Sequence, residues 1–560
     1  IQSGKLKLPI TLSFHIDDYA RINQIPSAVG AGWSLSTDLQ VSREINGADD
    51  FVNGYYTQSH QITDDSAITD NLTRISKYLN LYTNNTDGEP DKFYYKLLDK
   101  SGAFYFDKNQ DAITVPLNST KIQKTRDGFT ITDTDGTKYY YYGTIDKIQT
   151  GHHPAIAWRC RSIVAPNNVD SIYFEYASET YLTESSNEKL EIYDKPDDAL
   201  ISHNPFVILG ETNLNGAFIP SNTSFAKLPV PRMVVYSMPY ESYWLYSFSE
   251  GFRQFDFWDL SMNNRYSTSY LFDSNYIKAI HFKGGVVRFS YRYHSTNDHG
   301  PLNNLHALKT IKVYDGQNRL QKTISFNQTN IGYSRNLDSF IVDGEKYDCK
   351  YGSSHLIRVM SDYWGYEQAG GYGDNVSYSI PKLSMELIGG THYYDGTKVT
   401  RNEIKDIGYC SEESIHATKP PYNILTLTYP TGGKTVFTVE NHKSYGLEKP
   451  HRTGGCRIQK ISYYDSDNKL LKENEYKYGK DECGYGSMRS PITFDIEYGN
   501  CCATQTVTYY DFSNGLYGNI GSIRKRTIFG HPTTKQHFDG GCPVAYSEVA
   551  VYDSRPDGGK

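Results

Sequence analysis

The stretch Gly432-Gly433-Lys434-Thr435 comes nearest to a known catalytic signature, because a phosphate-binding loop ends in glycine, lysine and a hydroxyl residue. The glycine that such a loop carries upstream is missing, and the neighbouring residues alternate between apolar and polar types as strands do. We therefore predict that Gly432 and Gly433, which follow Pro430, form a hairpin turn. A Gly-x-Ser-x-Gly nucleophile elbow is absent from the sequence.

Two further patterns contain side chains that bind metals. His152 and His153 are adjacent, but neighbouring strand residues point to opposite faces, and no third ligand stands at a zinc-site spacing. Asp107, Asn109 and Asp111 alternate like the start of a calcium loop, yet the sixth place holds alanine and no glutamate closes the loop. We predict neither a metal site nor a cofactor.

Paired carboxylates are the remaining catalytic possibility. Glycoside hydrolysis needs two carboxyl groups about 5–10 Å apart, a separation that the fold sets and the sequence does not. We expect Asp17-Asp18 and Asp49-Asp50 to be exposed acids in turns, and we assign no catalytic residue.

Aromatic residues offer a binding surface instead. Tyr243, Trp244 and Tyr246 belong to a run that is apolar on both faces of a strand, so they must be buried or bind a glycan or a protein. The four tyrosines at 139–142 could belong to such an aromatic platform too, but sheet packing alone explains most of these rings.

Tyrosine is the unusual residue of this 560-residue chain, with 50 copies against 24 phenylalanines and 5 tryptophans. It favours half-buried sheet surfaces, where the ring packs and the hydroxyl stays in water, so the composition predicts a β protein. The net charge of −7 gives no indication of nucleic-acid or anionic-membrane binding, which require basic patches. No run of 18 apolar residues predicts a membrane-spanning helix.

The eight cysteines form no Cys-x-x-Cys pair, and their scatter fits buried small residues or at most one or two disulfides. Their pairing stays open. They are Cys160, Cys349, Cys410, Cys456, Cys483, Cys501, Cys502 and Cys542.

The elements that position these residues begin with a glycine-tryptophan corner at 28–35. Gly30 and Gly32 suit a backbone with positive φ or a close approach by another strand. Trp33 is then a large apolar anchor whose indole N–H needs a partner, and Arg43 lies in the alternating strand that follows. We expect this corner to fix the place where two sheets meet.

Strands and hairpins are predicted along most of the chain. Residues 7–16 alternate as a first strand, and residues 70–82 have the spacing of one short helix. Hairpins are predicted around 93–106 and 128–142. Similar units recur near 171–176, 278–293, 308–326, 424–440, 457–478, 503–510 and 521–528.

Several hairpins share a Tyr-Asp pair at the turn. In Tyr314-Asp315 and Tyr464-Asp465, we expect the tyrosine to end the strand and the aspartate carboxylate to accept hydrogen bonds from backbone N–H groups of the turn. Tyr394-Asp395, Tyr510-Asp511 and Tyr552-Asp553 are looser versions. The predicted fold class is all-β, with multiple antiparallel sheets built from consecutive hairpins and one or two short helices.

Three units are predicted. Residues 1–155 form an N-terminal β module with the corner and the helix, 156–380 a central β-sheet module, and 381–560 a C-terminal β module with Tyr-Asp hairpins. The alternative that the sheets continue without independent domains stays open.

Together these motifs resemble the N-terminal region of secreted or cell-surface RHS/YD-repeat proteins of Bacteroidetes bacteria. The resemblance extends over nearly the whole chain, with Ala31 and Cys456 as departures. From the same resemblance we expect the chain to be truncated before the further repeats of such proteins. The motifs that carry the resemblance are residues 29–35, 42–47, 89–91, 101–104, Asp362-Tyr363-Trp364-Gly365-Tyr366, 429–437 and 454–458.

The resemblance implies a β-sheet spiral that contributes to a hollow shell around a toxic C-terminal domain. Our first hypothesis is therefore a non-enzymatic scaffold, secreted or on the outer-membrane surface, that helps to encapsulate, present or deliver an effector in interbacterial competition. Its partners would be the remainder of its own polypeptide and an export or surface-anchoring component. The alternatives are a module that recognises glycan or protein through an aromatic face, and a carboxylate-dependent glycoside hydrolase.

Overall fold

The described elements of the computed structural model are strands, with one 3-10 turn, η6 (Lys480–Glu482). Some strands are described by their backbone alone. The structure describes residues 1–15, 26–46, 49–52, 54–55, 90–107, 109–149, 154–194, 207–212, 218–220, 262–293, 305–331, 334–352, 360–361, 367–368, 383–394, 397–407, 424–445, 450–488, 502–511, 518–529 and 542–554.

Eight strands of the N-terminal part lie side by side as antiparallel neighbours in the order β8, β7, β6, β5, β12, β11, β10, β9. The turns between β6 and β7 and between β10 and β11 are those predicted from the sequence. The strands are β5 (Gln40–Glu44), β6 (Lys92–Lys96), β7 (Ser101–Phe106), β8 (Ala112–Val115), β9 (Lys121–Thr125), β10 (Gly128–Thr132), β11 (Lys138–Gln149) and β12 (Ala155–Val164).

Two long strands, β13 (Ser171–Asp194) and β16 (Met262–Phe282), pair with each other and extend the same sheet. β13 also pairs with β12, and β16 with β11, so the sheet closes on itself at this junction. At its far end β13 pairs with β32, which continues to β31, β14 and β15. These strands are β14 (Val207–Thr212), β15 (Phe218–Pro220), β31 (Cys502–Asp511) and β32 (Gly518–Phe529).

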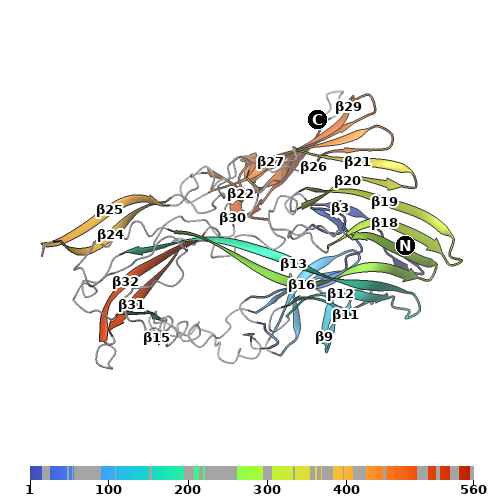
Figure 1. The fold of residues 1–560 in the computed structure, drawn as a ribbon. Coiled ribbons are helices and arrows are strands. Elements are labelled where there is room, and N and C mark those ends of the chain that lie inside the picture. The colour runs from blue at the N-terminus through green and yellow to red at the C-terminus, as the bar shows by residue number, and fades with distance from the viewer. Residues whose placement is uncertain are drawn as a thin grey trace.

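From β16 the sheet continues through ten further antiparallel strands (Figure 1). β13 and β16 cross the middle of the molecule, between β31 and β32 on one side and this series on the other (Figure 1). The series is β17 (Gly285–Tyr293), β18 (His306–Asp315), β19 (Leu320–Ile331), β20 (Ser334–Val342), β21 (Glu345–Tyr351), β26 (Ile424–Thr428), β27 (Lys434–Tyr445), β28 (Pro450–Tyr464), β29 (Leu470–Tyr478) and β34 (Val549–Ser554).

The remaining strands form separate pairs, each antiparallel. They are β1 (Gln2–Ser3) with β2 (Leu6–Lys7), β3 (Leu12–Phe14) with β4 (Trp33–Leu35), β22 (Met360–Ser361) with β23 (Glu367–Gln368), β24 (Leu383–Tyr394) with β25 (Thr397–Ile407), and β30 (Ser487–Met488) with β33 (Val544–Ala545).

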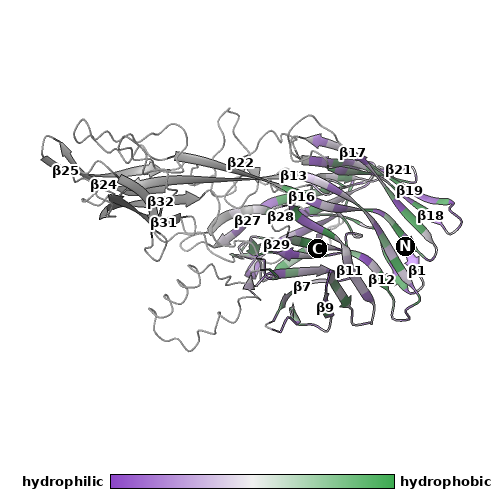
Figure 2. Ribbon diagram, turned by 60° about the horizontal axis from the view of Figure 1, so that its bottom comes forward, coloured by the Kyte–Doolittle hydropathy of each residue, from purple (hydrophilic) through white to green (hydrophobic). Residues whose placement is uncertain are grey.

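One hydrophobic core extends from the corner through β5–β12 to β20. Its centre is aromatic: the rings of Phe93 and Phe104 stack 5.1 Å apart, and Phe129 meets Trp158 edge-on at 4.8 Å. Complete burial of each such ring stabilises the fold by about 1.5–3 kcal/mol. The outer strands show hydrophilic and hydrophobic residues along the same element (Figure 2), as expected of sheets that bury one face.

The alternation explains the four consecutive tyrosines of β11. Tyr139 and Tyr141 are buried in the core, whereas Tyr142 on the opposite face is 44% exposed. Burial raises the pKa of Tyr141 well above its ordinary value. The sheet-packing explanation of this run is therefore confirmed.

Two predictions about the N-terminal elements have different outcomes. The single strand predicted over 7–16 is wrong, because β2 ends at Lys7 and β3 begins at Leu12. Pro9 has no N–H for a sheet ladder. Ser36 instead holds this stretch, its Oγ donating to Pro9 O (2.5 Å) and accepting from Thr11 N–H (2.8 Å). The helix predicted over 70–82 lies outside the described residues.

The hydrogen-bonded sheet passes through all three predicted units. The first predicted boundary, at 155/156, falls at the start of β12, which pairs with both β11 and β5. The three-domain division stays a prediction.

Candidate functional site

The glycine-tryptophan corner docks onto β18 and β20. Gly30 and Gly32 have the positive φ values expected from the sequence, 122° and 72°. Ala31 N–H donates to Arg335 O (2.7 Å), and Leu308 N–H donates to Ala28 O (2.7 Å). A Cβ atom on Gly30 would lie 3.1 Å from the backbone nitrogen of Leu337, so a side chain there would crowd β20.

Trp33 connects the corner to β21 by a hydrogen bond. Its indole Nε1–H donates to Tyr351 Oη (2.8 Å), which in turn donates to Leu337 O (2.8 Å). The Trp33 ring also packs against Phe14 at 5.0 Å. The predicted partner of the indole is thus a tyrosine 318 residues along the chain, at the place where the corner meets β20 and β21.

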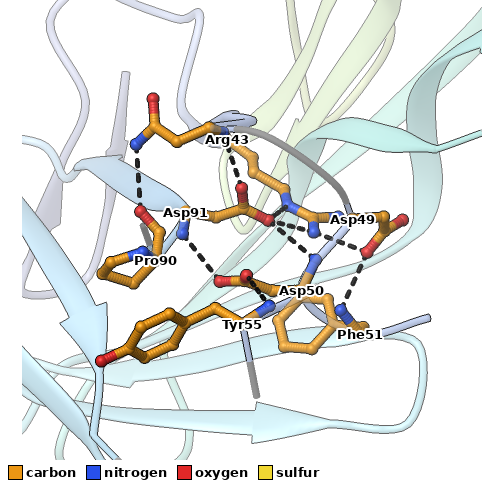
Figure 3. A network of polar contacts seen from close by, with 8 residues as sticks. Arg43, Asp49, Asp50, Phe51, Tyr55, Pro90 and Asp91 are labelled. Carbon is orange, nitrogen blue, oxygen red and sulfur yellow. Dashed lines mark hydrogen bonds and ion pairs between the residues drawn. The ribbon is translucent and has the colours of Figure 1, made fainter. Parts of the chain in front are cut away.

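Arg43 is the centre of a buried ionic network (Figure 3). Its guanidinium donates through Nε (2.8 Å) and Nη2 to the Asp91 carboxylate, and through Nη2 to Asp49 Oδ1 (2.6 Å). Asp91 also accepts hydrogen bonds from the backbone N–H groups of Asn46 (2.8 Å) and Asp50 (3.2 Å). Burial alone would lower the pKa of Arg43, but hydrogen bonds to Asp49 and Asp91 outweigh it and raise that pKa.

The expectation that Asp49 and Asp50 are exposed turn acids is wrong. Asp50 is completely buried, and its carboxylate accepts hydrogen bonds from Asp91 N–H (2.7 Å) and Tyr55 N–H (2.9 Å). These acids hold the segment after β5 against the start of β6 (Figure 3). Two of the motifs that carried the resemblance are therefore joined by one network, through Arg43 and Asn46 of the first and Asp91 of the second.

The Tyr-Asp turns have the predicted geometry. Asp315 Oδ1 accepts from Gln317 N–H (3.0 Å) and Arg319 N–H (2.9 Å), between β18 and β19. Asp465 Oδ1 accepts from the N–H groups two and four residues later, at 2.9 Å each, between β28 and β29. Tyr464 ends β28 as predicted, whereas β18 continues one residue past Tyr314, to Asp315.

Other turn predictions are resolved in different ways. Gly432, with φ of 85°, and Gly433 connect β26 to β27 as predicted, just after Pro430. Tyr552-Asp553 is not a turn, because it lies inside β34. Asp107 Oδ1 accepts from the N–H groups of Asn109 (2.8 Å) and Asp111 (2.9 Å), so this carboxylate stabilises a turn.

Several predicted residues lie outside the described part of the chain. They are Asp17-Asp18, His152-His153, the aromatic residues Tyr243, Trp244 and Tyr246, and the motif residues Tyr363, Trp364 and Gly365.

A pocket of about 880 Å³ lies beside the corner. Its wall includes residues 26–29 and 34–35 of the corner, parts of β5 to β7, and Ser274–Ile277 of β16. Besides Lys96 of β6 and several tyrosines, five ionisable side chains from distant parts of the sequence line it: Asp38, Arg159, Glu179, His306 and Arg335. The volume is in the range of pockets that bind small molecules.

Two of these acids lie beside cationic or basic groups. Glu179 Oε2 is 2.6 Å from His306 Nδ1 and accepts the His306 backbone N–H at 2.9 Å. The His306 ring also stacks on Tyr276, with centroids 4.5 Å apart. Burial raises the pKa of Asp38, and the positive charge of Arg159 opposes this shift. Arg159 itself forms an ion pair with Asp146 (2.6 Å).

The sequence reasoning missed this set of residues, because they come from five separate segments. One signal was available for Arg335. It stands two residues before Leu337 in β20, so period-two alternation places it on the buried face beside an apolar side chain.

A second ionic cluster holds the C-terminal strands together. Arg457 donates to Glu440 Oε1 through Nε (2.9 Å) and Nη2 (2.7 Å) and lies over the ring of Tyr478 at 4.2 Å. His442 Nδ1 is 3.0 Å from Tyr546 Oη. Burial, with the nearby charge of Arg457, lowers the pKa of His442 to about 3.

Among the cysteines of the described residues, Cys160, Cys349 and Cys483 are free thiols. Cys160, Cys349 and Cys456 are buried, as expected of small core residues, while Cys483 is exposed and Cys542 is intermediate. Within the same residues, no three histidine, cysteine or acidic side chains gather as a metal site.

β34 is the last described strand of the series that begins at β17. Among the described strands it pairs with β29 alone. Val549, Val551 and Tyr552 of this strand are 49%, 55% and 40% exposed. A strand with large exposed apolar residues and one paired edge is suited to adding another strand.

No known protein family and no curated protein sequence matches this chain. Solved structures with weak similarity include TcdB2-TccC3 (9% identity, TM-score 0.28, 93% of this chain and 28% of that chain) and TcdB2-TccC3-TEV (10%, 0.21, 93% and 26%). Another is a Photorhabdus luminescens Tc holotoxin pore (9%, 0.20, 98% and 32%). The chain thus spans about a third or less of these proteins, and functional proposals rest on its own geometry.

No helix of the described residues is both long enough and apolar enough to cross a membrane.

Proposed function

We propose that this chain is a non-enzymatic β scaffold on the N-terminal side of a secreted or cell-surface RHS/YD-repeat protein. It would form part of a wall that helps to encapsulate, present or deliver a C-terminal effector in interbacterial competition. Its main partner would be the remainder of its own polypeptide, with an export or surface-anchoring component as a second partner.

The observation that supports this proposal is the continuity of the antiparallel sheet from β5 to β34, whose second edge has no partner among the described strands. Two buried arginines of this sheet link neighbouring strands. Arg43 joins β5 to the start of β6, and Arg457 joins β28 to β27. We infer that these ion pairs fix the relative positions of the strands they join, because separating them would leave a buried charge uncompensated.

Imaging tests the proposal. Electron cryo-microscopy of the native polypeptide should show residues 1–560 inside the wall, or at one end, of a closed shell. The same residues produced alone serve as the comparison and should have an open sheet edge at β34. If residues 1–560 project from the native particle as a separate lobe, the scaffold proposal is wrong, and the alternative of a glycan- or protein-binding module takes its place.

A further inference from the structure

Three arginines are buried in the described part of the chain, and one differs from the other two. Arg43 and Arg457 each form hydrogen-bonded ion pairs with carboxylates. Arg335 is 2% exposed, and within the described residues its side chain makes one hydrogen bond, from Nη2 to the backbone oxygen of Ser27 (2.9 Å). Its Nε is buried and has no hydrogen-bond partner. A buried guanidinium without an anion is costly, so its location needs an explanation.

The location of Arg335 provides one, because this residue lines the 880 Å³ pocket. Burial lowers the pKa of Arg335 to about 10, and the more distant Glu179 opposes that shift. The side chain therefore remains a cation at neutral pH. A guanidinium in a low-dielectric wall is a strong receptor for a carboxylate.

The other polar groups of the pocket determine what else the ligand carries. Glu179 is hydrogen bonded to His306, and Asp38 lies near Arg159. Since both carboxylates have positive or hydrogen-donating neighbours, a ligand ammonium group gains little there. Neutral hydroxyl groups can donate to the remaining lone pairs of these carboxylates. The planar rings of Tyr276 and Tyr291, also in the wall, offer apolar surface beside them.

We propose that this pocket binds a hydroxylated carboxylic acid of monosaccharide size, a sugar acid, with its carboxylate on Arg335 and its hydroxyl groups toward Glu179 and Asp38. This binding site is independent of the scaffold role, because the pocket is lined by the corner and by residues of β5–β7, β12, β13, β16–β18 and β20, and not by the edge strand β34. Failure of either proposal leaves the other intact.

Isothermal titration of residues 1–560 with sodium glucuronate tests the proposal, with glucose and glycine as comparison ligands. Glucuronate should bind, and glucose, which lacks the carboxylate, should bind about tenfold or more weakly, as expected for loss of a charged hydrogen bond. Glycine, which adds an ammonium group and lacks the hydroxyls, should also bind more weakly. Absence of glucuronate binding, or equal binding of glucose, overturns the proposal.

Substitutions identify the residue responsible. Arg335→Met should weaken glucuronate binding about tenfold or more while leaving the weak glucose binding unchanged. The matched control Arg292→Met removes an exposed arginine of β17 and should bind as the unaltered chain does. Arg335 also donates a hydrogen bond to the backbone oxygen of Ser27, so its substitution can disturb the fold. A near-ultraviolet circular dichroism spectrum of each variant should therefore show that the tertiary packing is unchanged.

Arg335→Lys covers the case in which the methionine variant does not fold. It keeps the charge but loses the forked geometry, so its glucuronate affinity should fall below that of the unaltered chain and retain a preference over glucose. Ser274→Leu is a second test, because it narrows the pocket without touching Arg335. Unchanged glucuronate affinity in both folded variants would contradict the assignment.

Discussion

At the scale of single residues, the long-range contacts of this protein are made by polar groups at the tips of large side chains. Trp33 packs as an apolar ring, yet its position is fixed by the indole hydrogen bond to Tyr351. The Tyr351 hydroxyl in turn donates a hydrogen bond to the backbone oxygen of Leu337 in β20. This pattern is expected of buried tryptophan and tyrosine, whose polar atoms need partners. It connects segments that lie hundreds of residues apart.

The Trp33–Tyr351 contact can be measured with a double-mutant cycle. Trp33→Phe and Tyr351→Phe should each lower the free energy of unfolding by about 1–3 kcal/mol, through a lost hydrogen bond and lost contacts. The double variant should lose less than the sum of the two, by about 0.5–1.5 kcal/mol. Urea denaturation monitored by circular dichroism measures all three values. Simple additivity would mean that the bond does not stabilise the corner.

His442 should make stability depend on pH. Its pKa is about 3 in the folded chain, against 6.5 ordinarily, because burial and the charge of Arg457 disfavour the proton. Below pH 6.5 the unfolded chain binds a proton that the folded chain does not, so this contribution falls as pH decreases from 6.5 toward 3. Above pH 6.5 it is fully present. At pH 5 the loss should be about 2 kcal/mol.

The test compares the free energy of unfolding at pH 7 and pH 5. His442→Gln removes the titrating ring, so its decrease between the two pH values should be smaller than that of the unaltered chain by about 2 kcal/mol. His281→Gln is the control, since His281 lies on the surface of β16 with its side chain 49% exposed. An unchanged pH dependence in His442→Gln would show that the group is not held in its neutral form.

At the scale of elements, sequence patterns were informative wherever the chain pairs with its immediate neighbour. The hairpins at 93–106 and 128–142, and the two Tyr-Asp turns, follow from local alternation and turn residues. Interruptions were harder to predict. The alternation of residues 7–16 continues through Pro9, although proline has no N–H for a sheet ladder, and the hydrogen bonds from Ser36 to this stretch appear only in the folded chain.

Contacts between distant elements were beyond the same reasoning. The sequence shows Arg43 and Asp91 as parts of two separate motifs, and nothing local states that they meet. From the sequence, Asp50 is expected to be an exposed acid in a turn. Its burial depends on Asp91 N–H and Tyr55 N–H being presented to it by the assembled fold.

The Tyr-Asp turn gives a prediction for one hairpin. Asp465→Ala removes two hydrogen bonds to the turn between β28 and β29 and should lower the free energy of unfolding by about 0.5–2 kcal/mol. Amide hydrogen exchange at Lys469 should accelerate. Asp467→Ala, in the same exposed turn, is the control and should change neither quantity. A similar effect in both variants would indicate that turn conformation, and not the carboxylate of Asp465, is responsible.

At the scale of the whole molecule, the arrangement is one sheet that both encloses a core and continues past it. The core extends from the corner to β20. The long strands β13 and β16 continue the hydrogen-bonded sheet beyond this core. The series that begins at β17 ends, among the described strands, at β34. Val549 and Val551 of β34, the last strand of this series that the structure describes, are 49% and 55% exposed.

The edge at β34 should therefore self-associate when no other strand is available to it. In sedimentation velocity, residues 1–560 should show a weight-average sedimentation coefficient that rises with concentration. Val551→Lys places a charge on this edge strand and should weaken the association about tenfold, because lysine on an edge opposes strand addition. Val169→Lys is the control, since Val169 is 72% exposed in the turn between β12 and β13. Equal weakening by both lysines would indicate a general effect of charge, and a monomer at every concentration would remove the edge as the site of assembly.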